Sequence, residues 1–170
     1  MAPALVFGYG SLLAGAAGTP CRLPGHRRRF GVAMDNRRTI PGYKYYLDAA
    51  TGERPAVFVS FLDIVEDPGS AVEGLAFGVD AATLAALDDR ERNYRRVAVD
   101  GRLWAYTGLP EARERYARAA ADGRAVIARA YLEGVSAGLA SAGLVLDAEP
   151  EVPVVDLVRV DVPRPVSGRR

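Results

Sequence analysis

The chain has 170 residues, of which 49% are hydrophobic and 25% are charged, and its formal net charge at pH 7 is +1. These values are typical of one globular domain with its own core, and they exclude a strong electrostatic attraction to nucleic acid or to membranes. The single cysteine and single histidine exclude an internal disulfide and the usual ligand set of a zinc site.

We therefore predict one domain over residues 1–170, with residues 163–170 as a frayed tail, and no nucleic-acid or membrane partner. The N-terminus has no basic segment followed by a long apolar run, so no signal peptide is expected. No stretch approaches the ~18 uninterrupted apolar residues of a membrane span. A cytoplasmic protein is expected, and its oligomeric state stays open.

The N-terminal half is predicted to be mostly β-structure. A short buried strand over residues 4–7 runs into the turn Gly8-Tyr9-Gly10-Ser11. Two glycines around one aromatic residue allow a sharp bend whose N–H groups can point at an anion. Further along the chain we predict a loop over 14–24, a strand over 30–34, an irregular segment over 36–54, and two strands over 56–63 and 71–79 joined as a hairpin.

The second half begins with a helix over residues 81–91 that Asp80 can cap. A hairpin over 95–106 is predicted to turn at Asp100-Gly101. Then follow two helices, over 111–121 and 125–142, and a late strand over 154–162. This order indicates an α+β fold with a mixed sheet or small barrel, closed or nearly closed, rather than regular βαβ winding.

Glu91 is the most unusual residue of this pattern. Leu84, Leu87 and Glu91 are spaced i, i+3 and i+7, which places all three on the helix face expected to pack against the sheet. A buried carboxylate has a raised pKa or finds hydrogen bonds, and a raised pKa suits a general acid–base group. In the alternative interpretation the helix frays first, and Glu91 is an exposed side chain paired with Arg90 or Arg95.

The glycine turn is equally compatible with a structural turn, because its spacing matches neither the dinucleotide fingerprint nor the phosphate loop. Ser11 as a nucleophile would need His26, the only histidine, as its base, and nothing but sequence proximity places the two together. The basic cluster that begins at His26 is more typical of a solvated face than of a carboxylate site. Cys21 has no evident partner to activate its thiol.

Several segments, in this order, make the chain resemble the gamma-glutamylcyclotransferase-like superfamily. They are Phe7-Gly8-Tyr9-Gly10-Ser11-Leu12-Leu13, Val72 to Val79, Leu87-Asp88-Asp89-Arg90-Glu91 followed by Tyr94, the hairpin from Val97 to Gly108, and Ala130-Tyr131-Leu132-Glu133-Gly134-Val135. The resemblance covers residues 5 to about 143. The segment 36–54 and the residues after Gly143 depart from the family pattern and are expected to shape the mouth of the pocket.

The resemblance implies a fold with a central cavity and a cofactor-free enzyme that releases 5-oxoproline from a small γ-glutamyl substrate. It implies Glu91 as the general acid–base residue. It also implies that Tyr94, Tyr131 and the backbone N–H groups of Tyr9, Gly10, Ser11 and Leu12 bind the substrate. Neutral donors hold an anion without adding a fixed positive charge that would pair with Glu91 and lower its basicity. The leaving group stays open among an amino acid, the Cys-Gly of glutathione and an alkylamine.

Two other functions stay open. A protein with the same cavity that has lost the chemistry would bind an amino-acid-like ligand without turning it over. An amide hydrolase would use Glu91 to activate water and would release glutamate. The products separate the three alternatives.

Overall fold

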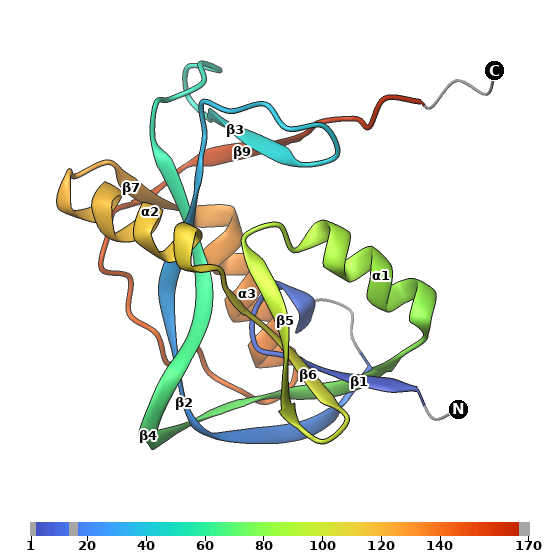
Figure 1. Cartoon of the computed structure of the whole chain (residues 1–170). Helices are drawn as coiled ribbons and strands as arrows, with labels where there is room; N and C mark the ends of the chain where they lie inside the picture. The colour runs from blue at the N-terminus through green and yellow to red at the C-terminus, as the bar shows by residue number, and fades with distance from the viewer. Residues whose placement is uncertain (1–2, 14–16, 167–170) are drawn as a thin grey trace.

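The computed structural model describes residues 3–13 and 17–166 (Figure 1). In chain order the elements are β1 (Ala4–Gly8), the 3-10 helix η1 (Ser11–Leu13), β2 (Thr19–Asp35), β3 (Lys44–Asp48), β4 (Phe58–Val79), α1 (Ala81–Arg90), β5 (Tyr94–Asp100), β6 (Leu103–Gly108), α2 (Pro110–Ala121), β7 (Ala125–Ala128), α3 (Arg129–Ser141), β8 (Val154–Val155) and β9 (Leu157–Asp161). None of the helices in these residues has the length and apolarity needed to cross a bilayer.

Within the described residues, a seven-stranded sheet has the order β5-β6-β1-β4-β7-β8, with β2 paired to β4 off this path. Strand β1 is antiparallel to β4 and parallel to β6, and β7 is parallel to both β4 and β8. The predicted α+β fold with a mixed sheet is therefore confirmed. Among residues 3–13 and 17–166, no pairing between β5 and β8 closes this sheet into a ring.

The elements with strong local signals follow the predictions. Asp80 caps α1 by accepting a hydrogen bond from the Thr83 N–H at 2.7 Å, as expected for an aspartate at this position. The β5–β6 hairpin turns at Gly101, whose φ of 45° is in the left-handed region. Leu84 and Leu87 pack against Val6, Val79 and Tyr106 of the sheet.

The predicted hairpin over 56–79 is wrong. These residues form one long strand, β4, and both of its halves pair with β2 rather than with each other. The register steps from Pro24–Ala71 to His26–Glu66, so residues 67–70 lie opposite Gly25 as a bulge. Pro68 cannot donate a ladder hydrogen bond and falls in this bulge, where its missing donor does no harm.

The loop predicted over 14–24 is wrong from Thr19 onward, and residues 14–16 lie outside the described residues. Strand β2 begins at Thr19 and includes Pro20 and Pro24. Within the described residues β2 pairs only with β4, so it is an edge strand. Edge strands tolerate proline because one side of their backbone has no ladder partner.

Two further elements differ from the predictions. Residues 125–128, predicted as helix, form the fully buried strand β7 between β4 and β8. The prediction was wrong because a short run of buried apolar residues does not show whether its period is that of a helix or that of a strand. The segment 36–54 contains β3, which pairs with β9 in a separate two-stranded ribbon. Figure 1 shows this ribbon at the upper end of the molecule, above α1 and α3.

The tail is only partly described, since residues 167–170 lie outside the structure's described range. Residues 163–166 have no regular secondary structure. They are not without contacts, however, because the Arg164 guanidinium lies 3.4 Å from an Asp89 carboxylate oxygen at the end of α1. The tail therefore passes along the site described next.

Candidate active site

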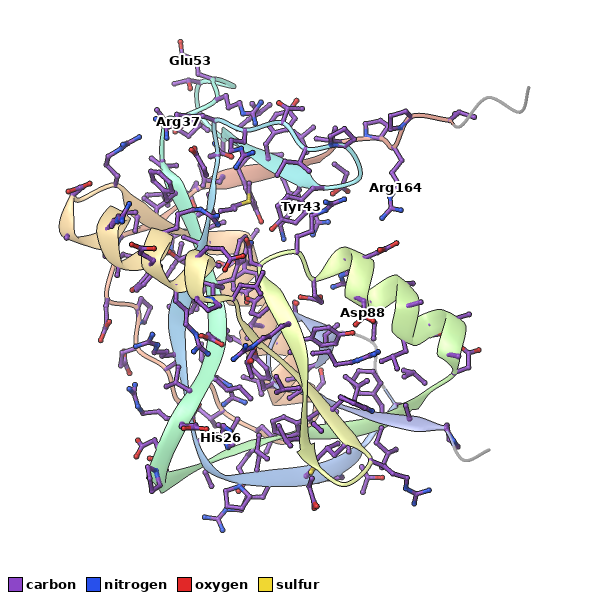
Figure 2. All side chains as sticks on the ribbon, in the orientation of Figure 1. His26, Arg37, Tyr43, Glu53, Asp88 and Arg164 are labelled. Atoms are coloured by element: carbon purple, nitrogen blue, oxygen red, sulfur yellow. The ribbon has the colours of Figure 1, made fainter. Side chains whose placement is uncertain are left out.

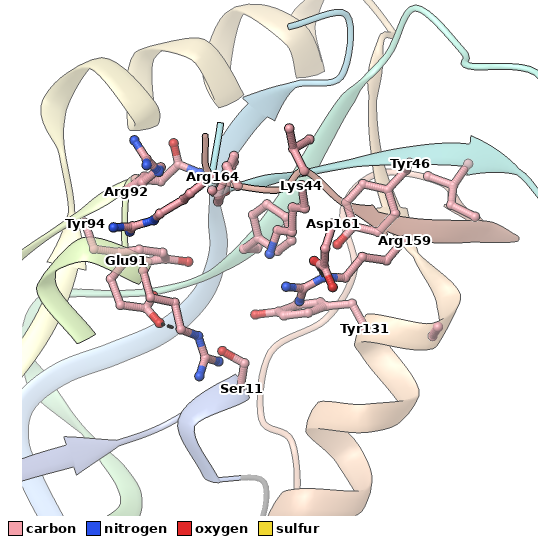
Figure 3. Close-up of a pocket in the computed structure, with 18 of the residues that line it drawn as sticks. Ser11, Lys44, Tyr46, Glu91, Arg92, Tyr94, Tyr131, Arg159, Asp161 and Arg164 are labelled. Carbon is pink, nitrogen blue, oxygen red and sulfur yellow. Dashed lines mark hydrogen bonds and ion pairs between the residues drawn. The ribbon is translucent and has the colours of Figure 1, made fainter. Parts of the chain in front are cut away.

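Two adjoining cavities lie between the β3–β9 ribbon, the end of α1, the start of α3 and the glycine turn (Figure 3). The larger has a volume of about 420 Å³, and the smaller, about 20 Å³, lies against the turn. Ser11, Glu91, Tyr94 and Tyr131 line both cavities. Tyr9, Gly10 and Leu12 line the smaller one. The structure thus brings together every residue predicted for the site.

Glu91 stands where α1 ends. Its N–H still donates to the Leu87 carbonyl at 2.9 Å, but its ψ of 60° takes the chain out of the helix. The side chain is only 12% exposed, and one carboxylate oxygen lies 3.5 Å from the Arg90 Nε. The alternative of an exposed, frayed Glu91 is therefore wrong, although the Arg90 pair that it included is present.

Opposing effects act on the Glu91 carboxyl. Burial is the largest and raises its pKa above the ordinary 4.5, while the Arg90 guanidinium and the Lys44 ammonium lower it. The neutral donors of the glycine turn bring no charge to Glu91, but the Arg90 guanidinium does, at 3.5 Å from the carboxylate. Desolvation outweighs both cations, so the pKa of Glu91 is shifted toward neutrality.

Tyr94 and Tyr131 bind the two backbone polar groups of Leu62, which belong to successive peptide units of β4. The Tyr94 hydroxyl donates to the Leu62 carbonyl at 2.6 Å, and the Tyr131 hydroxyl accepts from the Leu62 N–H at 3.1 Å. Tyr94 therefore keeps its oxygen lone pairs for a ligand, whereas Tyr131 keeps its proton. Burial raises the pKa of both phenols, so both remain neutral.

The glycine turn is held in place by tertiary contacts. The Tyr9 hydroxyl donates to the Tyr106 carbonyl at 2.6 Å, and burial raises the pKa of this phenol. The Tyr9 carbonyl accepts from the Arg28 Nε at 2.9 Å. On the other side of the turn, a Cβ at Gly74 would lie 2.3 Å from the Gly8 carbonyl oxygen, so only glycine allows β4 to approach this closely.

Two other reactive side chains considered from the sequence, His26 and Cys21, lie away from the site. Figure 2 shows His26 at the lower bend of the molecule, far from Tyr43 at the pocket. Its Nδ1 is 3.0 Å from the Pro24 carbonyl, and it lines neither cavity, so a Ser11–His26 pair is not formed. Cys21 also lines neither cavity, and burial raises the pKa of its thiol.

A profile of the family described as "Gamma-glutamyl cyclotransferase, AIG2-like" matches residues 6–134. The chain belongs to this family. Among solved structures, a gamma-glutamyl cyclotransferase is similar at 17% identity and a TM-score of 0.47, over 83% of this chain and 80% of the other. An uncharacterized protein from Homo sapiens is similar at 15% identity and a TM-score of 0.47, over 89% and 94%. No curated protein matches the chain significantly.

Part of the pocket of this gamma-glutamyl cyclotransferase family member comes from outside the matched residues. Arg159, Asp161 and Arg164 follow residue 134 and line the larger cavity. Sequence reasoning missed them, together with Lys44. The alternation of Lys44 and Tyr46 with Tyr45 and Leu47 is typical of a strand and was a signal for β3. The strand that pairs with β3 lies more than a hundred residues away, so the sequence does not show which residues face Lys44.

Arg28 was also missed, because it sits in a basic cluster that is typical of a solvated face. Only Arg28 of this cluster is classed as buried, at 2% exposure. Its guanidinium donates to the Tyr9 and Glu73 carbonyls and forms an ion pair with Asp147. Arg28 therefore holds the glycine turn in position, and it lines neither cavity.

The replacement Tyr131→Phe is expected to lower the free energy of unfolding by about 1–3 kcal/mol, because the Leu62 N–H loses its acceptor inside the pocket wall. The matched control is Tyr45→Phe. Tyr45 is on the ribbon face that carries no pocket residue, and in the described part of the chain its hydroxyl has no hydrogen bond. Urea unfolding of both variants measures the difference, and equal losses would contradict the role of Tyr131 as an acceptor.

Proposed function

We propose that this protein releases 5-oxoproline from a γ-glutamyl amide by attack of the substrate's own α-amine on its γ-carbonyl. The observation that carries the proposal is the Glu91 carboxylate, which is 12% exposed and lines both cavities beside the glycine turn. Membership of the gamma-glutamyl cyclotransferase family supports this chemistry.

In this proposal Glu91 takes one proton from the α-ammonium, and the freed amine attacks the γ-carbonyl carbon. A five-membered ring closes to a tetrahedral oxyanion, the bond to the leaving nitrogen breaks, and Glu91 returns the proton to that nitrogen. Glu91 then carries the second surplus proton of the ring nitrogen to the released amine, so the products are 5-oxoproline and an ammonium. Because the nucleophile is tethered to the electrophile, proximity supplies a large part of the rate. A raised pKa suits a group that must accept and then release a proton near neutral pH.

The two tyrosines divide the polar contacts of the glutamyl group. Tyr94 has only lone pairs left to offer, so it suits the α-ammonium of the substrate. Tyr131 has a free proton, so it suits a carboxylate oxygen or the developing oxyanion. Both hydroxyls are held by the backbone of Leu62 in strand β4, which fixes the positions of the donor and the acceptor.

The glycine turn supplies backbone donors. The Leu13 N–H donates to the Gly10 carbonyl at 3.0 Å. Among the described residues, the N–H groups of Gly10, Ser11 and Leu12 donate no such turn hydrogen bond to a backbone carbonyl. These groups line the smaller cavity and suit the α-carboxylate of the glutamyl group. Tyr9 holds the turn in place, because its hydroxyl donates to the Tyr106 carbonyl, and it also lines the smaller cavity.

The test is mass-spectrometric detection of 5-oxoproline and glutamate after incubation with γ-glutamyl dipeptides, glutathione and γ-glutamylamines. Release of 5-oxoproline with an equal amount of free amine is the expected result. Release of glutamate instead would identify a hydrolase and would remove the cyclisation step. Binding without either product, measured by calorimetry on the same panel, would identify a protein that has kept the cavity and lost the chemistry.

A further inference from the structure

The lining of the larger cavity carries an excess of positive charge. Its lining includes five cationic side chains and two carboxylates, namely Lys44, Arg90, Arg92, Arg159, Arg164, Glu91 and Asp161. The whole chain has a net charge of only +1, so this is a local concentration rather than a general property. Figure 3 shows Lys44 and Arg159 on the side of the pocket that lies away from Glu91 and Tyr94.

The β3–β9 ribbon places these charges on one face. Lys44 pairs in register with Asp161, and Tyr46 pairs with Arg159. Directly opposed residues of an antiparallel pair share a face, and alternate residues along a strand do so too. All four therefore face the same way, and all four line the cavity. The ribbon thus presents Lys44 and Arg159 together to the pocket.

Most of the other cations already have partners. Arg90 lies beside Glu91, and Arg164 lies 3.4 Å from Asp89. Arg92 donates to the Pro41 carbonyl at 3.1 Å. Arg159 shares a 2.8 Å contact with Asp161 through its Nε, which leaves the N–H groups at the other end of its guanidinium available.

Lys44 differs from these four. In the described part of the chain, its ammonium has no ion pair and no hydrogen bond, and it lies 4.3 Å from the centre of the Phe61 ring. The nearby charges are Arg159 and Asp161 of β9 and Glu91 and Arg90 at the end of α1. Burial, with the two arginines, lowers the pKa of Lys44 to about 8, because the two carboxylates do not compensate for the lost water.

We propose that Lys44 and Arg159 bind a carboxylate on the leaving group, so that the preferred substrates are γ-glutamyl amino acids or peptides rather than γ-glutamylamines. This inference rests on the proposed function. The glutamyl group would occupy the end with Glu91 and the tyrosines, and the leaving group would extend toward the ribbon. A carboxylate there would give Lys44 its missing ion partner and would satisfy the free donors of Arg159.

The kinetic test compares γ-glutamylalanine with γ-glutamylalaninamide, which differ only in the charge of the terminal group. The wild-type protein is expected to have a kcat/KM for the acid that is about 10- to 100-fold higher, as for a charge-assisted hydrogen bond in a half-buried site. Lys44→Met is expected to remove most of this preference by slowing the acid more than the amide. The readout is the ratio of the two kcat/KM values within each protein, because losing the Lys44 charge also raises the pKa of Glu91 and acts on both substrates alike.

The control is Arg102→Met, which removes a cation from the exposed β5–β6 turn, outside both cavities. It should leave both substrates unchanged. If the wild-type protein releases 5-oxoproline equally from the acid and the amide, the proposed function stands and the carboxylate site is overturned. Equal losses on both substrates in Lys44→Met would also overturn it.

A binding measurement keeps the inference testable if no substrate is turned over. Lys44 is the only lysine of the chain, so protein labelled with ¹³Cε-lysine gives one side-chain signal. In the Glu91→Gln protein, γ-glutamylalanine is expected to raise the pKa of Lys44 read from this signal, and γ-glutamylalaninamide is expected to leave it unchanged. An unchanged titration with both ligands would contradict the inference whatever the fate of the proposed reaction.

Discussion

Replacing Glu91 with glutamine is expected to lower the rate of 5-oxoproline formation by about 10²–10⁴-fold, the usual contribution of a general acid–base group. Glutamine has nearly the same shape, so the pocket and the end of α1 remain in place, but it neither accepts nor returns a proton. The measurement is kcat/KM on the best substrate of the γ-glutamyl panel. Since the proton transfers belong to the reaction and not to binding, the effect should appear mainly in kcat.

The matched control is Glu133→Gln, which removes an exposed carboxylate from α3, outside both cavities. Its kcat/KM should equal that of the wild type. If Glu91→Gln keeps most of the activity while Glu133→Gln does as well, Glu91 is not the base and the proposed mechanism fails.

The same variant also tests the raised pKa of Glu91 without any substrate. Because burial raises this pKa above the ordinary 4.5, the folded state holds the proton more tightly than the unfolded state does. The stabilisation from the protonated group is complete below about pH 4.5 and is lost as the pH rises through the folded-state pKa. The wild type should therefore lose stability relative to Glu91→Gln over this range. Urea unfolding at several pH values measures the difference in unfolding free energy between the two proteins. A difference that does not change with pH would contradict the raised pKa.

The second large effect is expected from Arg28→Met. Removing the guanidinium leaves the Tyr9 and Glu73 carbonyls without a donor in a buried position, and it removes the partner of Asp147. Each unsatisfied buried group costs about 1–3 kcal/mol, so a total loss of about 2–5 kcal/mol is expected. Asp147 is half exposed and adds little, because water replaces its partner. A loss of this size is a large fraction of the ~5–15 kcal/mol stability of a typical domain.

Arg27→Met provides the control on the same strand. Arg27 is half exposed and pairs with Asp67 at 3.4 Å, and such surface pairs contribute about 0–1 kcal/mol. Unfolding free energies of both variants in urea measure the contrast. Arg28→Lys keeps the charge but not the planar fork, so it should lie between the wild type and Arg28→Met. Equal effects of the Arg27 and Arg28 replacements would show that the turn does not depend on Arg28.

The elements that were predicted correctly are those that short-range contacts determine. Asp80 caps α1 through a residue three positions away, and the β5–β6 hairpin turns where Asp100-Gly101 supplies the required backbone conformation. The hairpin expected between the strands over 56–63 and 71–79 does not form, because β2 pairs with both halves of β4 on either side of the bulge at residues 67–70. The prediction of helix for residues 125–128 was wrong, because the four apolar residues of β7 include no polar residue that would reveal the two-residue period of a strand.

The site divides in the same way. The sequence by itself determined the family, the glycine turn, and the choice of Glu91, Tyr94 and Tyr131 as candidate site residues, since local motifs contain them. Only the tertiary structure decided that Tyr94 binds the carbonyl of Leu62 and that Tyr131 binds its N–H. These contacts leave Tyr94 as an acceptor and Tyr131 as a donor. It also decided that strands over a hundred residues apart bring Lys44 and Arg159 to one face, because strand register depends on pairing and not on spacing.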